Sequence, residues 1–97
     1  MANYVLLMNL TEQGVRTIKD SPGRAAEGMK AWEALGGKML SFHLTMGPYD
    51  YVAVVDAPSD EVAAAYALTL ASQGNVTTLS MKAFTVEQIG AIVAKMS

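Results

Sequence analysis

The stretch KMLSFHLTMGPYDYVAVVD, residues 38–56, decides the fold. We interpret it as two β-strands joined by a tight turn at Gly47-Pro48, because proline is excluded from central strands and glycine supplies turn dihedrals without steric cost. The flanking residues are mostly methionine, leucine, phenylalanine, tyrosine and valine, which suit a half-buried sheet. The segment therefore predicts a β-hairpin.

The position of the turn sets the register of this hairpin. Thr45 then lies opposite Asp50, and His43 lies opposite Val52. Side chains alternate between the faces of a strand, so a slip of one residue would exchange the two faces. One face carries Met39, Ser41, His43, Thr45, Asp50, Val52 and Val54, and the other carries Leu40, Phe42, Leu44, Met46, Tyr49, Tyr51, Ala53 and Val55. We expect the second, more apolar face to pack against helices.

Length and composition predict one small domain, residues 1–97. Its apolar content is more than a single protomer of this size is expected to bury. Hydrophobic residues make up 52% of the 97 residues, and the net charge is -2. Polar residues interrupt every long apolar window, so the apolar excess does not indicate a membrane segment. We expect it to be buried against another protomer. The sequence has no basic cluster, which argues against nucleic acid as a partner.

The residue types also restrict the chemistry. The chain has no cysteine, which excludes disulfides and zinc-thiolate sites. One histidine and one nearby aspartate fall short of the usual three or four metal ligands unless both protomers contribute, so we expect no metal site. We also expect no cofactor. The opening MANYVLLMNL lacks a basic leader and is interpreted as a strand rather than a signal peptide, which predicts a cytoplasmic protein.

The segments around the hairpin alternate between strands and helices. Residues 3–10 are apolar on both faces, which predicts a central strand. Thr11 is a candidate cap for a short helical segment. Ser21-Pro22 predicts the start of an amphipathic helix, with Ser21 as its cap and Pro22 at its first position. Gly36-Gly37 is expected to end this helix.

The second half repeats this pattern. Ser59 is expected to cap a helix that Gly74 ends, and residues 76–84 predict a fourth strand. Thr85 and Gln88 form a capping-box pattern at the start of a terminal helix.

This order predicts a ferredoxin-like α+β fold with an antiparallel sheet in strand order 4-1-3-2 and an extra C-terminal helix. Both long helices would cover one face of the sheet. The other face would carry Val5, Leu7, Val52, Val54, Leu79 and Met81. Exposing these apolar residues together is not expected of a monomer, so we predict a homodimer or higher homo-oligomer with facing sheets.

The hairpin segment MGPYDYVAVVDAP, with its Gly47-x-Tyr49-Asp50 signature, resembles the GYD domain family of small bacterial proteins. The opening YVLLMNLTEQG and the segment Pro22-Gly23-Arg24 are similar to that family too. The resemblance implies a dimeric α/β-barrel but no general function. A looser resemblance runs from Leu44 to Phe84, where residues 45–51 are similar to the effector-binding domain of the leucine-responsive, or feast/famine, regulators. That domain assembles dimers and binds amino acids, but this chain lacks the regulators' DNA-binding helix-turn-helix.

Candidate site residues gather at one end of the predicted sheet. The fold brings Asn9, His43, Thr45 and Asp50 to the same edge of the open face. A histidine beside a carboxylate is a feasible general base, which makes His43 and Asp50 candidate catalytic residues. Asn9 and Thr45 would orient a carboxylate or carbonyl group. Alternatively, Asp50 accepts backbone N–H bonds and fixes the hairpin, and His43 is an interface residue.

Two further residues are candidates for ligand binding. A hydroxyl such as that of Tyr49 can donate a hydrogen bond into a cavity, although the aromatic residues also suit the core. Arg24 lies in the first turn of a helix, where the helix dipole disfavours a cation. We therefore expect Arg24 to pair with an anion, either Asp20 or a ligand.

These observations favour a homo-oligomeric small-molecule-binding module. The alternatives are a small dimeric-barrel enzyme, monooxygenase- or isomerase-like, that uses His43 and Asp50 as acid and base, and a purely structural dimer. A pocket of roughly 300 Å³ or more between sheet and helices would favour binding or catalysis over the structural role.

Overall fold

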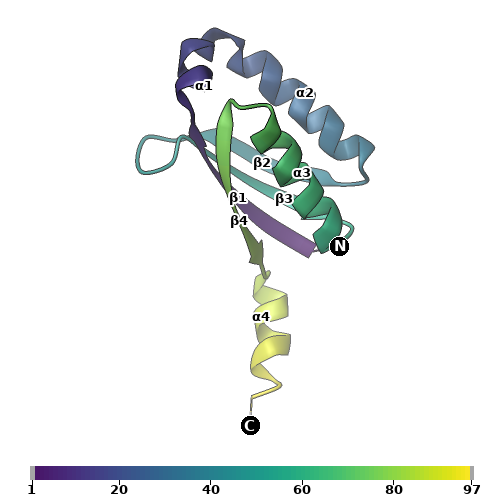
Figure 1. The fold of residues 1–97 in the computed structure, drawn as a ribbon. Coiled ribbons are helices and arrows are strands. Elements are labelled where there is room, and N and C mark those ends of the chain that lie inside the picture. The colour runs from purple at the N-terminus through teal and green to yellow at the C-terminus, as the bar shows by residue number, and fades with distance from the viewer. Residues whose placement is uncertain (1, 97) are drawn as a thin grey trace.

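A computed structural model of the chain describes residues 2–96 (Figure 1). The elements are β1 (Ala2–Leu10), α1 (Glu12–Arg16), the 3₁₀ turn η1 (Ile18–Asp20), α2 (Ser21–Ala34), β2 (Lys38–Leu44), β3 (Tyr51–Ala57), α3 (Asp60–Ser72), β4 (Val76–Ala83) and α4 (Val86–Val93). The four strands form one antiparallel sheet in the order β2-β3-β1-β4. The predicted ferredoxin-like α+β fold and strand order are confirmed.

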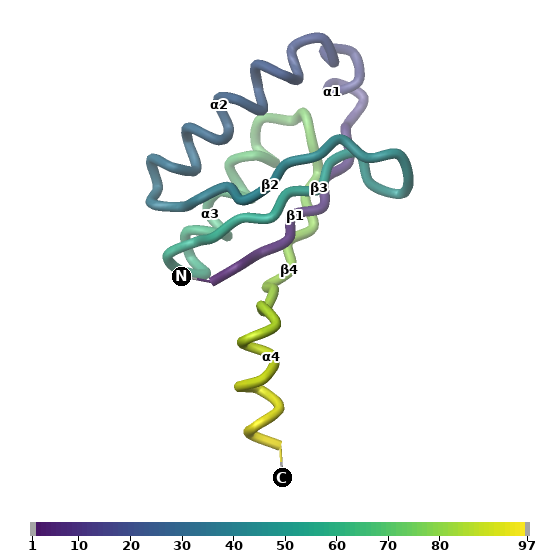
Figure 2. Tube along the Cα trace, turned by 180° about the vertical axis from the view of Figure 1, so that it is seen from behind, coloured from purple at the N-terminus to yellow at the C-terminus, as the bar shows by residue number. Residues whose placement is uncertain are grey.

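Helices α2 and α3 lie on the same face of the sheet, and α4 projects from the end of β4 (Figures 1 and 2). The core lies between this helix pair and the sheet. Its members are Tyr4, Leu6, Met8, Trp32, Tyr51, Ala53, Val55, Ala57, Ala63 and Tyr66. Alternate residues of β1 and β3 thus face the helices, as period-two alternation requires.

Side-chain caps begin three of the helices as the sequence predicts. Thr11 Oγ1 accepts the Gly14 N–H at 3.1 Å, and Ser59 Oγ accepts the Val62 N–H at 3.1 Å. Thr85 and Gln88 form the complete capping box that opens α4. These bonds satisfy N–H groups that have no partner within the helix.

The prediction that Ser21 caps α2 is wrong by one position. The helix begins at Ser21 itself, and the cap position belongs to Asp20, whose side chain makes no capping bond. The Ser21 hydroxyl instead shares a hydrogen bond of 2.6 Å with the Tyr51 hydroxyl of β3. The Ser21 hydroxyl thus joins α2 to the sheet instead of capping the helix.

The predicted register of the hairpin is confirmed, although its turn is wider than predicted. His43 pairs with Val52, and the Thr45 N–H donates to the Asp50 carbonyl at 2.8 Å. Residues 45–50 connect the strands as a loop that extends beyond the sheet, seen in teal in Figure 1. Leu44 and Met46 were expected to pack on helices, but both are exposed because they lie at this projecting end.

A β-bulge reverses the predicted faces at the start of β2. The register shifts between Met39 and Ser41, which leaves Leu40 as an extra residue. Met39 therefore packs against the core, whereas Leu40 is 45% exposed. The bulge adds one residue to one strand only, so every side chain before it changes face.

The second face of the sheet is apolar and open, as predicted. Val5 pairs with Val54 on one side and Met81 on the other. Leu7 pairs in the same way with Val52 and Leu79. Within residues 2–96 no helix covers this face (Figure 2). In the same part of the chain, no helix is long and apolar enough to cross a membrane.

Candidate functional site

A cavity of about 550 Å³ lies between the sheet and the helix pair α2 and α3. Leu6 and Met8 of β1 and Ala53 of β3 line it from the sheet side. From the helix side it is lined by small residues of α2 and by Tyr66 of α3. Most of this lining is apolar, so the cavity suits an apolar ligand.

The small residues of α2 create this space. Ala25, Gly28 and Ala31 recur every three residues along the helix and all line the cavity. Residues at this spacing share one face of a helix. Larger side chains at these positions would fill the gap between α2 and the sheet. This spacing is the sequence signal that could have predicted the cavity.

Polar residues gather where α2 begins and α3 ends. Ser21 and Arg24 belong to the first turns of α2, whereas Gln73 and Asn75 follow the last turn of α3. The cavity thus has apolar walls and a polar end.

Arg24 is the one predicted ligand-binding residue that lines the cavity. Its Nη1 atom donates to the carbonyl and the hydroxyl of Thr17, both at 3.0 Å. Among residues 2–96 the ion pairs are Arg16 with Glu12 and Lys82 with Asp60, so the expected pairing of Arg24 with Asp20 does not occur. Arg24 as a residue is half-buried, and a guanidinium has further N–H groups that can donate to an anionic ligand.

Two tyrosine hydroxyls connect the walls of the cavity. The Tyr66 hydroxyl donates to the Gly28 carbonyl at 2.7 Å and so joins α3 to α2. The Tyr51 hydroxyl contacts Ser21 and joins β3 to α2. Burial raises the pKa of Tyr66, which keeps this hydroxyl protonated and able to donate.

The residues predicted to form a site at the hairpin end lie at the same end of the sheet. The Asp50 carboxylate accepts the Leu10 N–H at 2.8 Å, and the Asp50 N–H donates to the Met8 carbonyl at 2.9 Å. Thr45 Oγ1 donates to the Tyr49 carbonyl at 2.5 Å. The two Asp50 bonds attach the hairpin loop to β1, whereas the Thr45 bond lies within the loop. Attachment by Asp50 is the structural alternative that the sequence left open for this residue.

The other members of that predicted site do not join Asp50 through their side chains. His43 is exposed on β2, and over residues 2–96 no hydrogen bond links it to Asp50. Asn9 pairs with Thr77 of β4 on the open face. Tyr49 is half-buried and does not line the cavity.

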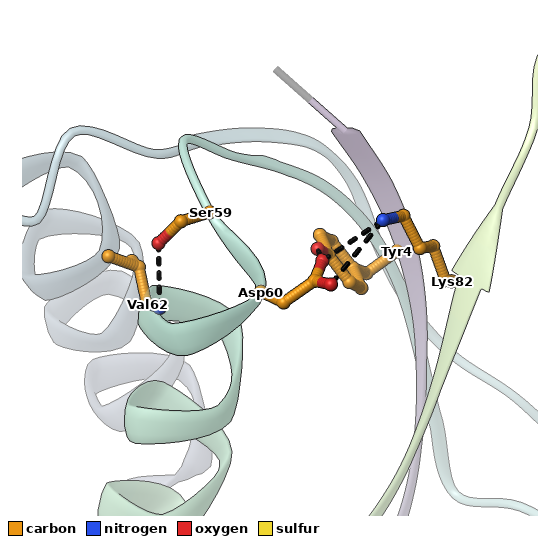
Figure 3. A network of polar contacts seen from close by, with 5 residues as sticks. All are labelled: Tyr4, Ser59, Asp60, Val62 and Lys82. Atoms are coloured by element: carbon orange, nitrogen blue, oxygen red, sulfur yellow. Dashed lines mark hydrogen bonds and ion pairs between the residues drawn. The ribbon is translucent and has the colours of Figure 1, made fainter.

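Sequence reasoning missed a polar network at the opposite end of the sheet (Figure 3). The Tyr4 hydroxyl donates to Asp60 Oδ1 in the first turn of α3, and Lys82 Nζ of β4 lies 3.2 Å from the same oxygen. The bond to Asp60 raises the pKa of Tyr4 to about 12. The same bond, and then the one from Lys82, lowers the pKa of Asp60. The network ties the start of α3 to β1 and β4.

Fold and cavity together define a class: a small ferredoxin-like α+β domain with a largely apolar cavity between sheet and helices and one open sheet face. The sequence model of the GYD domain matches residues 4–93, so the chain belongs to the GYD domain family. The chain is also 32% identical over 90 residues to a protein of Thermus thermophilus named "Glutamine synthetase and cystathionine beta-lyase binding protein". That match covers 92% of this chain and 95% of the relative. No solved structure gives a significant match to the chain.

Proposed function

We propose that the protein is a homo-oligomeric small-molecule-binding module whose site is the cavity between the sheet, α2 and α3. The observation that carries this proposal is the cavity itself, at about 550 Å³. Ligand pockets typically occupy about 300–1,000 Å³ and combine apolar walls with a few polar groups. Both conditions are met here.

The ligand that fits this site has an apolar body and one negatively charged end. Leu6, Met8 and Ala53 offer only apolar surface to the body. Arg24 offers guanidinium donors, which suit a carboxylate. Glu27 lines the cavity as well, so a single negative charge beside Arg24 fits better than a highly charged anion.

Binding can be tested by titrating the isotope-labelled protein with octanoate and with octan-1-ol while recording amide NMR spectra. We expect octanoate to shift the amides of Ala25, Gly28 and Ala53. Arg24→Gln should weaken octanoate binding at least about tenfold, because a hydrogen bond to a charged group contributes about 1.5–3 kcal/mol. The same variant should leave octan-1-ol binding unchanged.

Two variants control this experiment. Lys30→Gln removes a cation of the same helix that does not line the cavity, and octanoate binding should not change. Ala25→Phe should fill the cavity and abolish binding of both probes. The proposal fails if neither probe binds, or if the shifted amides belong only to the open sheet face.

Homodimerisation is the second part of the proposal. Its support is the open apolar face, on which Leu79 is 48% exposed and Met81 is 44% exposed. Contiguous apolar patches on a surface mark interaction sites. We also propose a cytoplasmic location for the dimer, which fractionation of cells that produce the tagged protein would test.

A second candidate function is protein binding. The Thermus thermophilus relative carries the name of a protein that binds two enzymes, which favours the same kind of partner here. Biolayer interferometry would test this function, with purified glutamine synthetase and cystathionine beta-lyase from the organism that encodes this chain. Saturable binding that Leu79→Asp abolishes would support this function. Absence of binding to both enzymes would count against it.

For Asp50 we propose a structural role rather than acid–base catalysis. Its carboxylate is engaged by the Leu10 N–H, and an acid–base pair would require contact with His43. Once a substrate is known, His43→Ala provides the test. Loss of turnover with unchanged ligand affinity would restore the enzymatic alternative.

A further inference from the structure

Helix α4 is the one element of the described chain that lies apart from the rest. It continues from the end of β4 and points away from the sheet and from α2 and α3 (Figures 1 and 2). None of its residues is buried. The large apolar side chains exposed on and beside it are Phe84, Val86, Ile89, Ile92, Val93 and Met96.

Such a helix is not stable on its own in water. It has 8 residues, whereas isolated helices shorter than about 12–15 residues are marginal even with favourable composition. The capping box at Thr85 and Gln88 sets its start but supplies no packing. In α-helical periodicity Val86, Ile89 and Val93 share one side. This apolar side therefore needs a surface to cover it.

The overall dimensions show how much surface is left uncovered. The radius of gyration is 14.7 Å, whereas a compact chain of this length has about 12.5 Å. The accessible surface is 6387 Å², against about 5,400 Å² for a folded monomer of this mass. The excess of about 1,000 Å² is close to the roughly 800 Å² that each partner buries in a standard interface.

The structure places α4 as a continuation of β4, away from its own sheet. β4 ends at Ala83 and the cap of α4 is Thr85, so Phe84 alone separates the strand from the cap. Within residues 2–96 the helix packs on neither the sheet nor the pair α2 and α3 (Figures 1 and 2). In this arrangement a surface that covers α4 has to come from another molecule.

We propose that α4 packs on a second copy of this chain, so that two copies exchange their α4 helices around a two-fold axis. One chain carries both uncovered apolar surfaces, the open sheet face and α4. A two-fold dimer applies the same contact twice and so covers both surfaces on both copies. This inference rests on the homodimer proposed above and adds the contact that α4 makes in it.

A mixed dimer tests the exchange directly. One copy is labelled with ¹³C and the other is unlabelled, and isotope-filtered NOE spectra then report only contacts between copies. We expect intermolecular NOEs from the Ile89 and Ile92 methyl groups. A dimer in which these methyl groups show contacts only within their own chain would overturn the exchange while leaving the dimer intact. A monomer at micromolar concentration would overturn both.

Two variants of α4 provide a matched comparison by analytical ultracentrifugation. Ile89→Glu places a charge on the apolar side and should raise the dimer dissociation constant at least about tenfold. Ala91→Glu adds the same charge on the opposite side of the helix and should leave it unchanged. Neither position is buried within the chain, so both variants should fold. If Leu79→Asp dissociates the dimer but Ile89→Glu does not, the sheet contact stands and the exchange of α4 is wrong.

Discussion

Both faces of strand β1 carry apolar residues, but the two faces lie in opposite environments. Tyr4, Leu6 and Met8 point towards the helices and are at most 5% exposed. Val5 and Leu7, between them, lie on a face that no helix of residues 2–96 covers. Apolar residues on a strand therefore do not show which face is buried within the chain and which face is left for another molecule to cover.

The covered face itself is not packed uniformly. There α2 presents small residues to the sheet, and a cavity remains. Elsewhere in the same core Trp32 and Val55 are fully buried. Native cores are close-packed and rarely leave gaps of this size. We infer that the covered face serves stability and ligand binding, whereas the open face serves association.

The largest expected effect comes from breaking the covered face. Trp32→Ala should lower the free energy of unfolding by about 3–5 kcal/mol, because it removes a side chain that is 1% exposed. The Trp32 ring also packs at a tilt against the Tyr66 ring, with the ring centroids 4.7 Å apart. Urea denaturation followed by circular dichroism measures this loss, which should be the same at every protein concentration.

Leu79→Ala is the matched change on the open face. Its effect on unfolding should be small in dilute protein and grow with concentration, because it acts through association. An equally large and concentration-independent loss for both variants would remove the distinction between the two faces.

Most of the fold could be predicted from the sequence because its signals are local. Caps at Thr11, Ser59 and Thr85 and the alternation in the strands depend only on neighbouring residues. The bulge at Leu40 could not be predicted, since it depends on how β2 fits its partner strand. The cap at Ser21 failed for a similar reason, because Tyr51, distant in sequence, takes its hydroxyl.

The candidate site was harder to predict than the fold. Arg24 was identified from its unfavourable place near a helix start, a local signal. The cavity beside it depends on the spacing between two helices and a sheet, which no single segment of sequence encodes. Asp50 was placed at the correct end of the sheet, but its bond to Leu10 required the pairing of β1 with β3.

A smaller effect on stability is expected from Asp50, which joins the hairpin loop to β1, the strand whose two faces are compared above. Asp50→Ala leaves the Leu10 N–H without its partner and should cost about 1–3 kcal/mol of unfolding free energy. Asp50→Asn keeps an acceptor oxygen and should cost less. Equal losses for the two variants in urea denaturation would show that the hydrogen bond does not stabilise the hairpin loop.

The smallest effect is expected from pH at the Tyr4–Asp60–Lys82 network on the covered side. The pKa of Asp60 is lowered on folding, so its contribution is present above the unfolded value of about 3.9 and is lost as pH falls through the folded value. The difference in melting temperature between wild type and Asp60→Asn should thus shrink as pH falls from about 6 to below 4.

At high pH the Tyr4 hydroxyl makes stability depend on pH in the opposite direction, so that stability falls as pH rises. Its pKa is raised to about 12, so its contribution is present below the unfolded value of about 10 and is lost as pH rises through 12. Tyr4→Phe should therefore destabilise the protein at pH 8 and differ less from wild type near pH 12. If Tyr4→Phe is as stable as wild type at pH 8, the hydroxyl does not stabilise the fold and Tyr4 contributes only through its ring.

The central claim is that each chain leaves one apolar surface to a second copy and keeps a separate cavity for a small molecule. Native mass spectrometry of the purified protein tests both parts in one measurement. We expect a species at twice the 10.3 kDa chain mass, with an additional small mass that Ala25→Phe removes. A species at the mass of a single chain at micromolar concentration would contradict the account.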